Sequence, residues 1–496
     1  MSDMKVIRGG RLVDIDTHSA PPTDILIRDD MVVELGPPGL AAPHDAEQID
    51  ATGHLMHAGL VNGHTHGHGN LAKGMGDRWS LELLLTAAPW ISGGRELEDK
   101  HLTTMIGAVE MLLKGCTAAY DLTFEFPSPT REGMAVSAEA YAEVGMRCVL
   151  APMVADISFF EAIPGLMKEL PPQLQTAVSG MRLAPAESTL EAIKDVVENW
   201  SVDANLVRPA VAPTIPHHCT DLFLKGCRDI ARAHGIGLHS HVAESKVQAV
   251  ASRRLYGKTL LAHMDDMGLV GSDFVVAHGV WLDDTDMKRL AAKGGHVSHN
   301  AGSNALLGSG IADARRMMEL GVNLAIGTDG ANCSDNQNMY EAMRAALYMS
   351  HVRGPDMGRW LSTSEILRAA TEGGAKALGI ENIGRVAPGY KADIVFLDLS
   401  HVNWIPFNDP VNQIVQTEDG TGVRHVMVGG EMVVRDRAPV RVDMVSLARE
   451  AEVARGRLEV ANAEKKAMFE KLAPVVSSFC PGLASEPYHI HRFASR

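Results

Sequence analysis

Two histidines separated by one residue, His64 and His66, directly follow an apolar run over residues 55–61. Side chains alternate between the two faces of a strand, so both imidazoles point to one face and can reach one metal ion. Gly63 and Gly67 leave room for the backbone to come close to that ion. This spacing also occurs in ordinary surface loops, so the pair indicates a metal site only together with the motifs that follow.

A second such pair, His239 and His241, ends another strand-like run and is followed by Glu244. A helix-like pattern ends near His234, so residues 237–242 are expected to form the next strand. A metal binds neutral imidazole, and a hydrolytic metal site also needs a carboxylate that moves protons. The alternative is a buried strand whose two histidines are satisfied by hydrogen bonds. The presence of the first pair favours the metal interpretation.

Two further polar residues close apolar runs, His278 after residues 274–277 and Asp329 after the run that starts at Val322. A charged group at the end of a buried strand needs a partner or a metal. A single strand-end histidine is usually structural, and Asp329 could instead cap the next helix. We expect both side chains to face the same site as the two histidine pairs.

Strand-like and helix-like patterns alternate through the middle of the chain, and eight apolar runs carry the strand pattern. These runs end near His64, Leu122, Val154, Pro213, Val242, His278, His299 and Thr328. Helical periodicity lies between them, for example over residues 100–113, 221–234, 284–292 and 312–320. Eight such units predict a (β/α)8 barrel over residues 59–384, which gathers strand-end residues at one mouth. The alternative is an open doubly wound sheet, but no G-x-G-x-x-G follows the first strand.

The two ends of the chain have a different sequence pattern from the middle. Short strands broken by turns occupy residues 1–58 and return over residues 385–440, which predicts one small β-sandwich domain assembled from both termini. Residues 441–496 are expected to form a long helix from about Met444 to Leu472 and an irregular tail after Pro474. This helix and the acidic balance favour a homo-oligomer; the alternative is that the helix packs on its own barrel.

Composition limits the classes of partner. The chain has 496 residues, of which 46% are hydrophobic and 22% charged, and a formal net charge of −15. Such a charge argues against binding to nucleic acid or to an anionic membrane surface. The six cysteines are scattered without a C-x-x-C pair, which favours free thiols in a reducing compartment. No signal peptide or membrane-spanning run is evident, and we expect a soluble cytoplasmic protein that acts on a small molecule.

Taken together, the motifs resemble those of the amidohydrolase superfamily, in particular its cytosine-deaminase and chlorohydrolase branch. The resemblance rests on H-x-H at the first barrel strand, H-x-x-E at the fifth, H-G at the sixth and G-T-D-G at the eighth. Residues 389–394, which read Gly-Tyr-Lys-Ala-Asp-Ile, are similar to the family's G-x-x-A-D-I/L signature. The similarity covers nearly the whole chain, including the split β domain.

The resemblance implies that one divalent metal ion is bound by His64, His66, His241 and Asp329. Zinc is the default, and iron, cobalt and manganese are the other candidates. The fourth strand ends Ala212-Pro213-Thr214 and offers no bridging lysine, which favours one metal over two.

The same resemblance assigns the catalytic roles. Glu244 would carry a proton from water to the leaving nitrogen, His278 would polarise the reacting centre, and Asp329 would also orient the water. The implied reaction is hydrolysis of a C–N bond at an sp² carbon, as in aminohydrolases of N-heterocycles. Alternatives are an amide, urea or carbamate hydrolase with the same site and a non-catalytic binding protein on the same fold. The last predicts lost site residues, and all six are present.

The substrate pocket departs from the family pattern. Thr214 stands where many relatives have a histidine that touches substrate, and Ala301 replaces a proline. Candidate substrate contacts are Thr214, His217, His218 and Asn304. Because threonine reaches less far than histidine, we expect weak activity on adenosine-type nucleosides and better activity on a smaller or less polar nitrogen compound, unless His217 or His218 replaces the missing contact.

Overall fold

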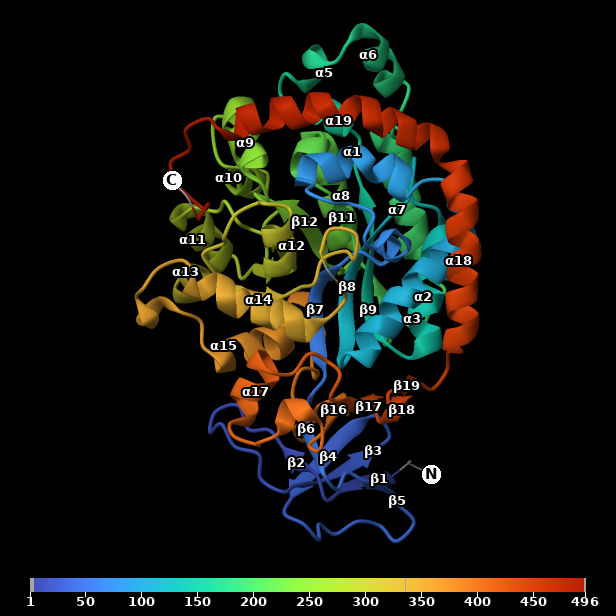
Figure 1. Ribbon diagram of the computed structural model, residues 1–496, viewed down its shortest axis with the longest axis vertical. Helices are drawn as coiled ribbons and strands as arrows, with labels where there is room; N and C mark the ends of the chain where they lie inside the picture. The colour runs from blue at the N-terminus through green and yellow to red at the C-terminus, as the bar shows by residue number, and fades with distance from the viewer. Residues whose placement is uncertain (1–3, 335, 495–496) are drawn as a thin grey trace.

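The computed structural model describes residues 4–334 and 336–494, in which a ring of parallel strands is surrounded by helices (Figure 1). A small β module from both ends of the chain lies below this barrel. Two long C-terminal helices, α18 (Met444–Ala461) and α19 (Ala463–Ala484), run up one side of the barrel and across its top. No helix within the described residues is long and apolar enough to cross a membrane.

The barrel strands form a five-stranded and a four-stranded sheet with parallel pairing throughout. The first holds β7 (Leu60–Thr65), β8 (Cys116–Phe124), β9 (Arg147–Val154) and β10 (Val207–Pro209), with β11 (Ala212–Pro213) continuing β10 along β9. The second holds β12 (Leu238–Val242), β13 (Phe274–His278), β14 (His296–His299) and β15 (Asn323–Ile326). All eight predicted runs are strands.

Backbone hydrogen bonds join the two sheets at both seams. At one seam, the His239 amide donates to the Val211 carbonyl at 3.0 Å; at the other, the Asp329 amide donates to the His64 carbonyl at 2.9 Å. The second seam requires a glycine, because a Cβ on Gly327 would lie 2.3 Å from the Asn300 side-chain oxygen and 3.0 Å from the His64 nitrogen. The same close approach brings Asp329 beside the histidines of β7.

Helices pack around the strands and bury their apolar sides. They are α2 (Leu97–Leu113), α3 (Arg131–Val144), α7 (Ala186–Glu198), α8 (Asp221–His234), α9 (Lys246–Tyr256), α10 (Leu260–Asp266), α11 (Asp284–Ala292), α12 (Ala301–Leu306), α13 (Ala314–Glu319), α14 (Met339–His351), α15 (Thr363–Arg368) and α16 (Gly374–Leu378). Their ends follow local rules: α8 starts at Thr220, whose hydroxyl accepts from the Phe223 amide, and ends at Gly235 in the left-handed region. The predicted helices match within about three residues.

Four short helices depart from this ring. Helix α1 (Leu81–Ile91) follows β7, and α4 (Phe159–Ala162), α5 (Leu166–Glu169) and α6 (Pro172–Ser179) follow β9. Helices α5 and α6 protrude at the top of the molecule, above α19 (Figure 1).

The small β module pairs strands from both termini. One sheet has the order β4 (Met31–Gly36), β3 (Asp24–Arg28), β1 (Met4–Arg8), β5 (Glu47–Asp50). The other has β19 (Ala438–Pro439), β18 (Glu431–Arg435), β17 (Val423–Val428), β16 (Ile394–Asp398), β6 (His54–Ala58) and β2 (Arg11–Leu12). Ile27, Met56 and Phe396 share one apolar cluster. The two termini therefore share a core, and the arrangement as a sandwich stays a prediction.

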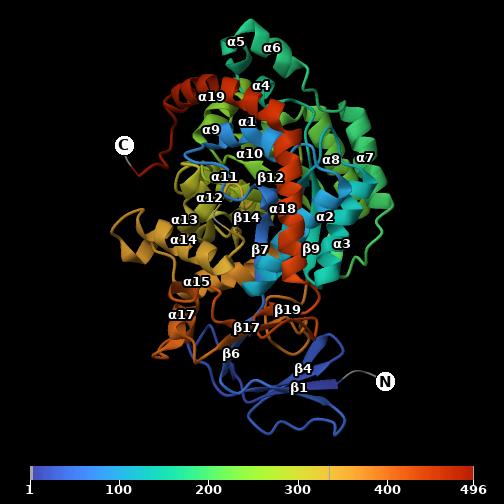
Figure 2. The same ribbon diagram turned by 45° about the vertical axis from the view of Figure 1, so that its right-hand side comes forward.

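The C-terminal segment differs from the expectation of an irregular tail after Pro474, which is wrong. Helix α19 continues through Pro474 and Pro481 to Ala484. Its Val476, Cys480 and Leu483 are buried in a cluster with residues of α5 and α9, and this packing outweighs the hydrogen bonds that the prolines remove. Helix α18 lies along α2 (Figure 2), and α19 contacts α1, α5 and α9.

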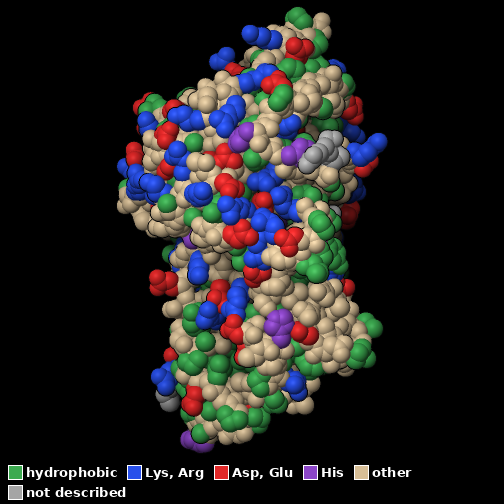
Figure 3. Space-filling view, turned by 90° about the vertical axis from the view of Figure 1, so that its left-hand side faces the viewer, with side chains coloured by type: hydrophobic (Ala, Val, Ile, Leu, Met, Phe, Trp, Pro, Cys, Tyr) green, Lys and Arg blue, Asp and Glu red, His purple; other side chains and the backbone are tan. Residues whose placement is uncertain are grey.

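Surface charge is mixed rather than segregated. On the face shown in Figure 3, Lys and Arg side chains alternate with Asp and Glu side chains over barrel and β module alike. Some of the charged side chains form ion pairs between helices, such as Arg316 of α13 with Asp284 of α11.

Candidate metal centre and active site

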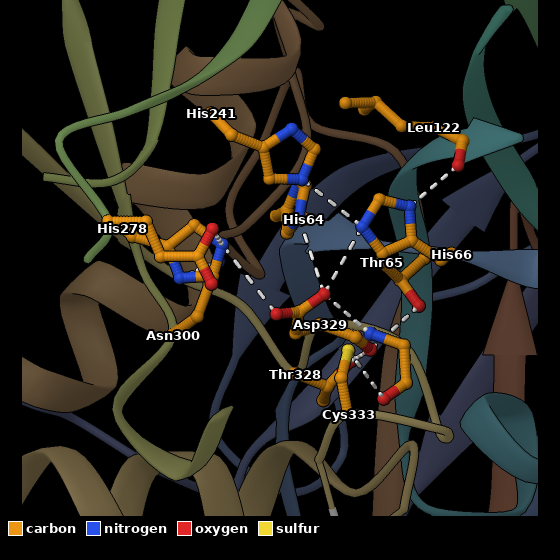
Figure 4. A network of polar contacts seen from close by, with 12 residues as sticks. His64, Thr65, His66, Leu122, His241, His278, Asn300, Thr328, Asp329 and Cys333 are labelled. Carbon is orange, nitrogen blue, oxygen red and sulfur yellow. Dashed lines mark hydrogen bonds and ion pairs between the residues drawn. The ribbon is translucent and has the colours of Figure 1, made fainter. Parts of the chain in front are cut away.

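The four predicted metal ligands come together at the carboxyl ends of the barrel strands. His64 and His66 end β7, His241 lies on β12 and Asp329 follows β15; all four side chains are buried (Figure 4). His66 Nε2 lies 3.2 Å from Asp329 Oδ1, and His64 Nε2 lies 3.6 Å from the same oxygen. The four residues that were predicted as ligands therefore form one cluster in the structure.

The hydrogen bonds at the rim of this cluster leave nitrogen lone pairs pointing inward. His66 Nδ1 donates to the Leu122 carbonyl and His241 Nδ1 donates to the Thr214 carbonyl, each at 2.7 Å. In the neutral rings both Nε2 atoms are then acceptors, yet these two atoms lie only 3.2 Å apart. Two lone pairs at this distance repel unless a cation lies between them. Such outward hydrogen bonds are typical of metal-bound histidines.

His64 is the third histidine of the cluster. Its ring is fully buried, and neither nitrogen has a hydrogen-bond partner among the described residues. Burial lowers the pKa of His64 to about 4, which leaves a neutral ring with a free lone pair. Burial opposes the charge of Asp329, but the neighbouring rings of His64 and His66 hold the pKa of this carboxyl well below its usual range. Three imidazole nitrogens and one carboxylate oxygen are a donor set that suits zinc and other divalent metals.

Two residues of the site have strained backbones. His278 and Asp329 adopt φ angles of 69° and 65°, in the left-handed region that non-glycine residues rarely occupy. Such conformations are held in place by their surroundings and cluster at functional sites. Here they turn the chain sharply at the ends of β13 and β15, so that both side chains face the cluster.

Glu244 and His278 form the second half of the site. His278 Nε2 lies 3.7 Å from Glu244 Oε2 and 3.6 Å from Asp329 Oδ2. Glu244 Oε2 is buried and has no hydrogen-bond partner in the part of the chain that the structure describes. Burial, together with the negative charges of Asp329 and Glu82, raises the pKa of Glu244 well above its usual range, so this carboxyl readily holds a proton.

A cavity of about 590 Å³ opens onto these groups. His66, His241, Glu244, His278 and Asp329 all contribute to its lining. The rest of the lining is mainly apolar and comes from α1, α4, α6 and the loops beside them, including Leu81, Leu84, Phe159, Phe160, Met181 and Leu183. A ligand in this cavity would meet a small polar centre at one side and apolar walls around it.

The four residues singled out as substrate contacts are not equivalent in the structure. Thr214 and His218 belong to the cavity lining, as expected. His217 lies outside the lining: its ring stacks on Tyr256 and its Nε2 lies 3.0 Å from the Ser252 hydroxyl. The structure thus brings Thr214 and His218 to the cavity and directs His217 toward α9.

Asn304 also lies outside the cavity lining, but it contacts the site. Its Oδ1 accepts from His278 Nδ1 at 2.8 Å, which fixes the orientation of that ring and leaves Nε2 toward Glu244. Asn304 is therefore a positioning residue for His278 in this geometry. The sequence contained Asn304 in a family-like motif, but nothing in its spacing indicated which side chain it would hold.

Several cavity residues were not predicted. His68 belongs to the same glycine-rich run as His64 and His66, and Arg95 and Lys465 come from a loop after α1 and from α19. The third histidine of the G-H-T-H-G-H run was a visible signal for His68. Arg95 and Lys465 carry no motif, and only the fold brings them to the cavity.

A family comparison decides where this chain belongs. The model of the Amidohydrolase family matches residues 55–433, which is most of the chain. The chain belongs to the amidohydrolase family. The prediction of a metal-dependent hydrolase of carbon–nitrogen bonds is confirmed at this level, and members of the family share the barrel seen here.

Individual relatives agree with this membership. The chain is 33% identical over 386 residues to a 5'-deoxyadenosine deaminase of Methanopyrus kandleri, covering 78% of this chain and 82% of the relative. A solved zinc-bound adenosine deaminase of Xanthomonas campestris is 26% identical, with a TM-score of 0.80, covering 92% of this chain and 98% of that one. A zinc complex of atrazine chlorohydrolase from Arthrobacter aurescens TC1, 22% identical with a TM-score of 0.81 over 91% of this chain and 99% of that one, shows the same fold.

Proposed function

We propose that this amidohydrolase is an aminohydrolase that removes an amino group from an sp² carbon of an N-heterocycle. The observation that carries the proposal is Glu244 Oε2, a buried and unpaired carboxyl oxygen that lies 3.7 Å from His278 Nε2 on the wall of the cavity. A hydrolytic site needs such a proton carrier next to its electrophilic centre. The deaminase relatives support the same class of reaction.

His64, His66, His241 and Asp329 would hold one divalent metal ion, with zinc as the first choice because of the nitrogen-rich donor set. When bound, the metal supplies the Lewis acidity that makes water nucleophilic at neutral pH. The hydrogen bonds from His66 to Leu122 and from His241 to Thr214 keep both rings in the tautomer that binds a metal.

Glu244 would move the proton that the reaction requires. As a carboxylate it accepts a proton from the attacking water at Oε2, and as a carboxylic acid it donates that proton to the leaving nitrogen. The new C–O bond forms as the C–N bond breaks, and the amino group leaves as ammonia. Burial raises the pKa of Glu244 well above its usual range, and this suits both halves of the exchange because the carboxyl holds the proton more firmly between accepting it and donating it.

His278 would stabilise the negative charge that develops on the substrate. Its Nδ1 proton is donated to Asn304, so a neutral ring presents Nε2 toward Glu244 and Asp329. From this place Nε2 can accept a proton from Glu244, and the imidazolium so formed can then donate it to the negatively charged reacting centre. The apolar walls around the site exclude water that would compete with these contacts.

The cavity supports a wider class of proposed substrates than the sequence did. The expectation of weak activity on adenosine-type nucleosides rested on Thr214, which is shorter than the histidine of many relatives. His218 lies on the same cavity wall and offers a second imidazole that can contact a ring nitrogen. We therefore include aminopurine nucleosides, on which the named relatives act, among the proposed substrates.

We also propose the division of the chain that the sequence predicts. Residues 1–58 and 385–440 would form a β-sandwich domain, residues 59–384 the catalytic barrel and residues 441–496 a C-terminal segment. The shared apolar cluster of β3, β6 and β16 supports the first unit. Assembly into a homo-oligomer is part of the same proposal, and the exposed Val445, Val453 and Val460 of α18 support it.

Ammonia release tests the proposal. The zinc-loaded protein is assayed with adenosine, 5'-deoxyadenosine, guanine, an aminotriazine, a dialkylurea and a carbamate at equal enzyme concentration. We expect ammonia from at least one amino-heterocycle, and release that is slower by roughly a hundredfold or more from the protein with Glu244→Gln at the same metal content. Turnover of only the urea or the carbamate would contradict the proposal and favour the alternative chemistry of the same site.

A further inference from the structure

Two cations on the cavity wall have no acidic partner. Arg95 lies in the loop that follows α1, and Lys465 lies in the first turns of α19. Within residues 4–334 and 336–494, neither side chain forms an ion pair. The third cation of the lining, Lys100, is paired with Glu125. Glu244 and Asp329, the other two carboxylates of the lining, belong to the metal centre.

Arg95 is held in place by backbone contacts only. Its two terminal nitrogens donate to the His68 and Ile91 carbonyls, and its Nε is buried without a partner. Asp99 of α2, whose negative charge acts on Arg95 without forming an ion pair with it among the described residues, is paired with Arg457. Burial lowers the pKa of Arg95 to about 10, which still leaves a full positive charge at neutral pH. A partly buried guanidinium without a counter-ion is unusual unless a ligand supplies one.

Lys465 is positioned by its helix and by the loop that carries Arg95. Its Nζ donates to Asn462 Oδ1 at 2.9 Å, and Asn462 Nδ2 donates to the Gly93 carbonyl at 2.8 Å. A Cβ on Gly93 would lie 2.6 Å from the Lys465 nitrogen, so the ammonium group lies directly against this glycine. The loop and α19 thus bring Lys465 close to the segment that leads into Arg95.

Lys465 comes from a part of the chain that lies outside the family match. Residue 465 lies beyond residues 55–433, the part of the chain that the family model matches. Helix α19 reaches the cavity because it packs across α1 at the top of the barrel (Figure 1). A residue of α19 can set the substrate preference without altering the metal centre, which is built from the barrel strands.

We propose that Arg95 and Lys465 bind an anionic group, a carboxylate or a phosphate, on the part of the substrate that is remote from the reacting amino group. This inference rests on the proposed aminohydrolase function, whose substrate it makes more specific. The substrate would be an amino-heterocycle whose apolar portion contacts α1 and whose anionic end lies near Gly93. A guanidinium and an ammonium together match the charge and the oxygen acceptors of both anions.

Equilibrium binding separates the two possible anions from a neutral control. The zinc-loaded Glu244→Gln protein, in which turnover is slow, is titrated by calorimetry with adenosine 5'-carboxylate, adenosine 5'-monophosphate and adenosine 5'-carboxamide. The same titrations are made after adding Lys465→Met, Lys465→Arg or Lys466→Met. Lys466 is the matched control, because its ammonium lies over the Trp90 ring, 5.4 Å from the ring centroid, and outside the cavity lining.

We expect at least one anion to bind roughly tenfold or more tightly than the carboxamide, as for a hydrogen bond between charged groups. Lys465→Met should remove most of this preference, whereas Lys465→Arg and Lys466→Met should keep it. The better-bound anion identifies the group as carboxylate or phosphate. Equal affinity for the three compounds, no binding of any of them, or an unchanged preference in Lys465→Met would overturn the inference.

Ammonia release by the protein with Glu244 intact tells the two proposals apart. Turnover of the carboxamide and of the anions with equal KM supports the aminohydrolase and contradicts the anion site. Tighter binding of an anion without any release of ammonia supports the anion site and contradicts the aminohydrolase.

Discussion

The two sides of the cavity are built differently. The metal side uses residues at the ends of β7, β12, β13 and β15, where adjacent strands hold the side chains within 3.2–3.7 Å of one another. The outer side uses helices α1, α4, α6 and α19, which come from distant parts of the chain and pack through apolar side chains. The rigid strand ends suit chemistry that tolerates little displacement, and the helical wall suits variation in substrate.

The largest effect should come from the metal side. His66→Ala removes one ligand and leaves His241 and Asp329 with unbalanced lone pairs and charge, so we expect loss of the metal together with loss of nearly all activity. The measurement is the metal-to-protein ratio by mass spectrometry beside the rate of ammonia release. His44→Ala is the control, because this histidine is fully exposed and far from the cavity lining. Full metal content and full activity in His66→Ala would remove His66 from the ligand set.

Glu244→Gln should separate chemistry from metal binding. The amide keeps the shape of the carboxyl but cannot carry a proton, so we expect normal metal content and a kcat reduced by roughly a hundredfold or more. Glu125→Gln is the matched control, because Glu125 is another carboxylate of the cavity wall and is paired with Lys100. This variant should keep kcat within a few-fold of the wild type, since such an ion pair contributes about 1 kcal/mol or less. A similar loss of kcat in both variants would mean that activity depends on the negative charge of the cavity rather than on a proton carrier.

Asn304→Ala should have a smaller effect that still belongs to the metal side. Without the oxygen that accepts from His278 Nδ1, the ring can turn or change tautomer. We expect kcat to fall by roughly tenfold to a hundredfold, the range seen when a residue behind a functional histidine is removed. KM and metal content should change little. An increased KM with unchanged kcat would instead place Asn304 in substrate binding, as the sequence suggested.

Phe469→Ala tests the outer wall and should have the smallest effect on kcat. The Phe469 ring of α19 packs between Trp79 and Trp90, with centroids 5.3 and 5.5 Å away. Its loss should loosen α1 and lower the free energy of unfolding by about 1–3 kcal/mol, because the ring is only partly buried. We expect KM to rise several-fold at unchanged metal content, measured by steady-state kinetics and thermal denaturation. Leu222→Ala, at an exposed position of α8, is the control.

The same contrast explains what the sequence could predict. His64, His66, His239 and His241 follow a period of two within strands, and local spacing was enough to place them on one face. The eight strands and most helices were also visible as local patterns. Alignment of Asp329 with His64 required only the closure of the barrel, which Gly327 permits.

The remaining features depend on packing between distant segments. Helix α19 passes through Pro474 because its apolar side is buried, and no local rule predicts that outcome. His217 and His218 are neighbours in sequence, yet one faces α9 and the other the cavity, because the 3-10 turn at Pro216–His218 directs them differently. Arg95 and Lys465 reach the cavity only through the contact between α1 and α19.

The central claim is that one metal ion is bound by His64, His66, His241 and Asp329, with Glu244 outside the ligand set. Anomalous scattering from crystals of the zinc-loaded protein, recorded on both sides of the zinc absorption edge, tests this claim most directly. The account predicts one zinc peak per chain in contact with all four side chains, and the same peak in Glu244→Gln. A peak bound through Glu244, two peaks at the site, or the absence of zinc from a fully active protein would contradict it.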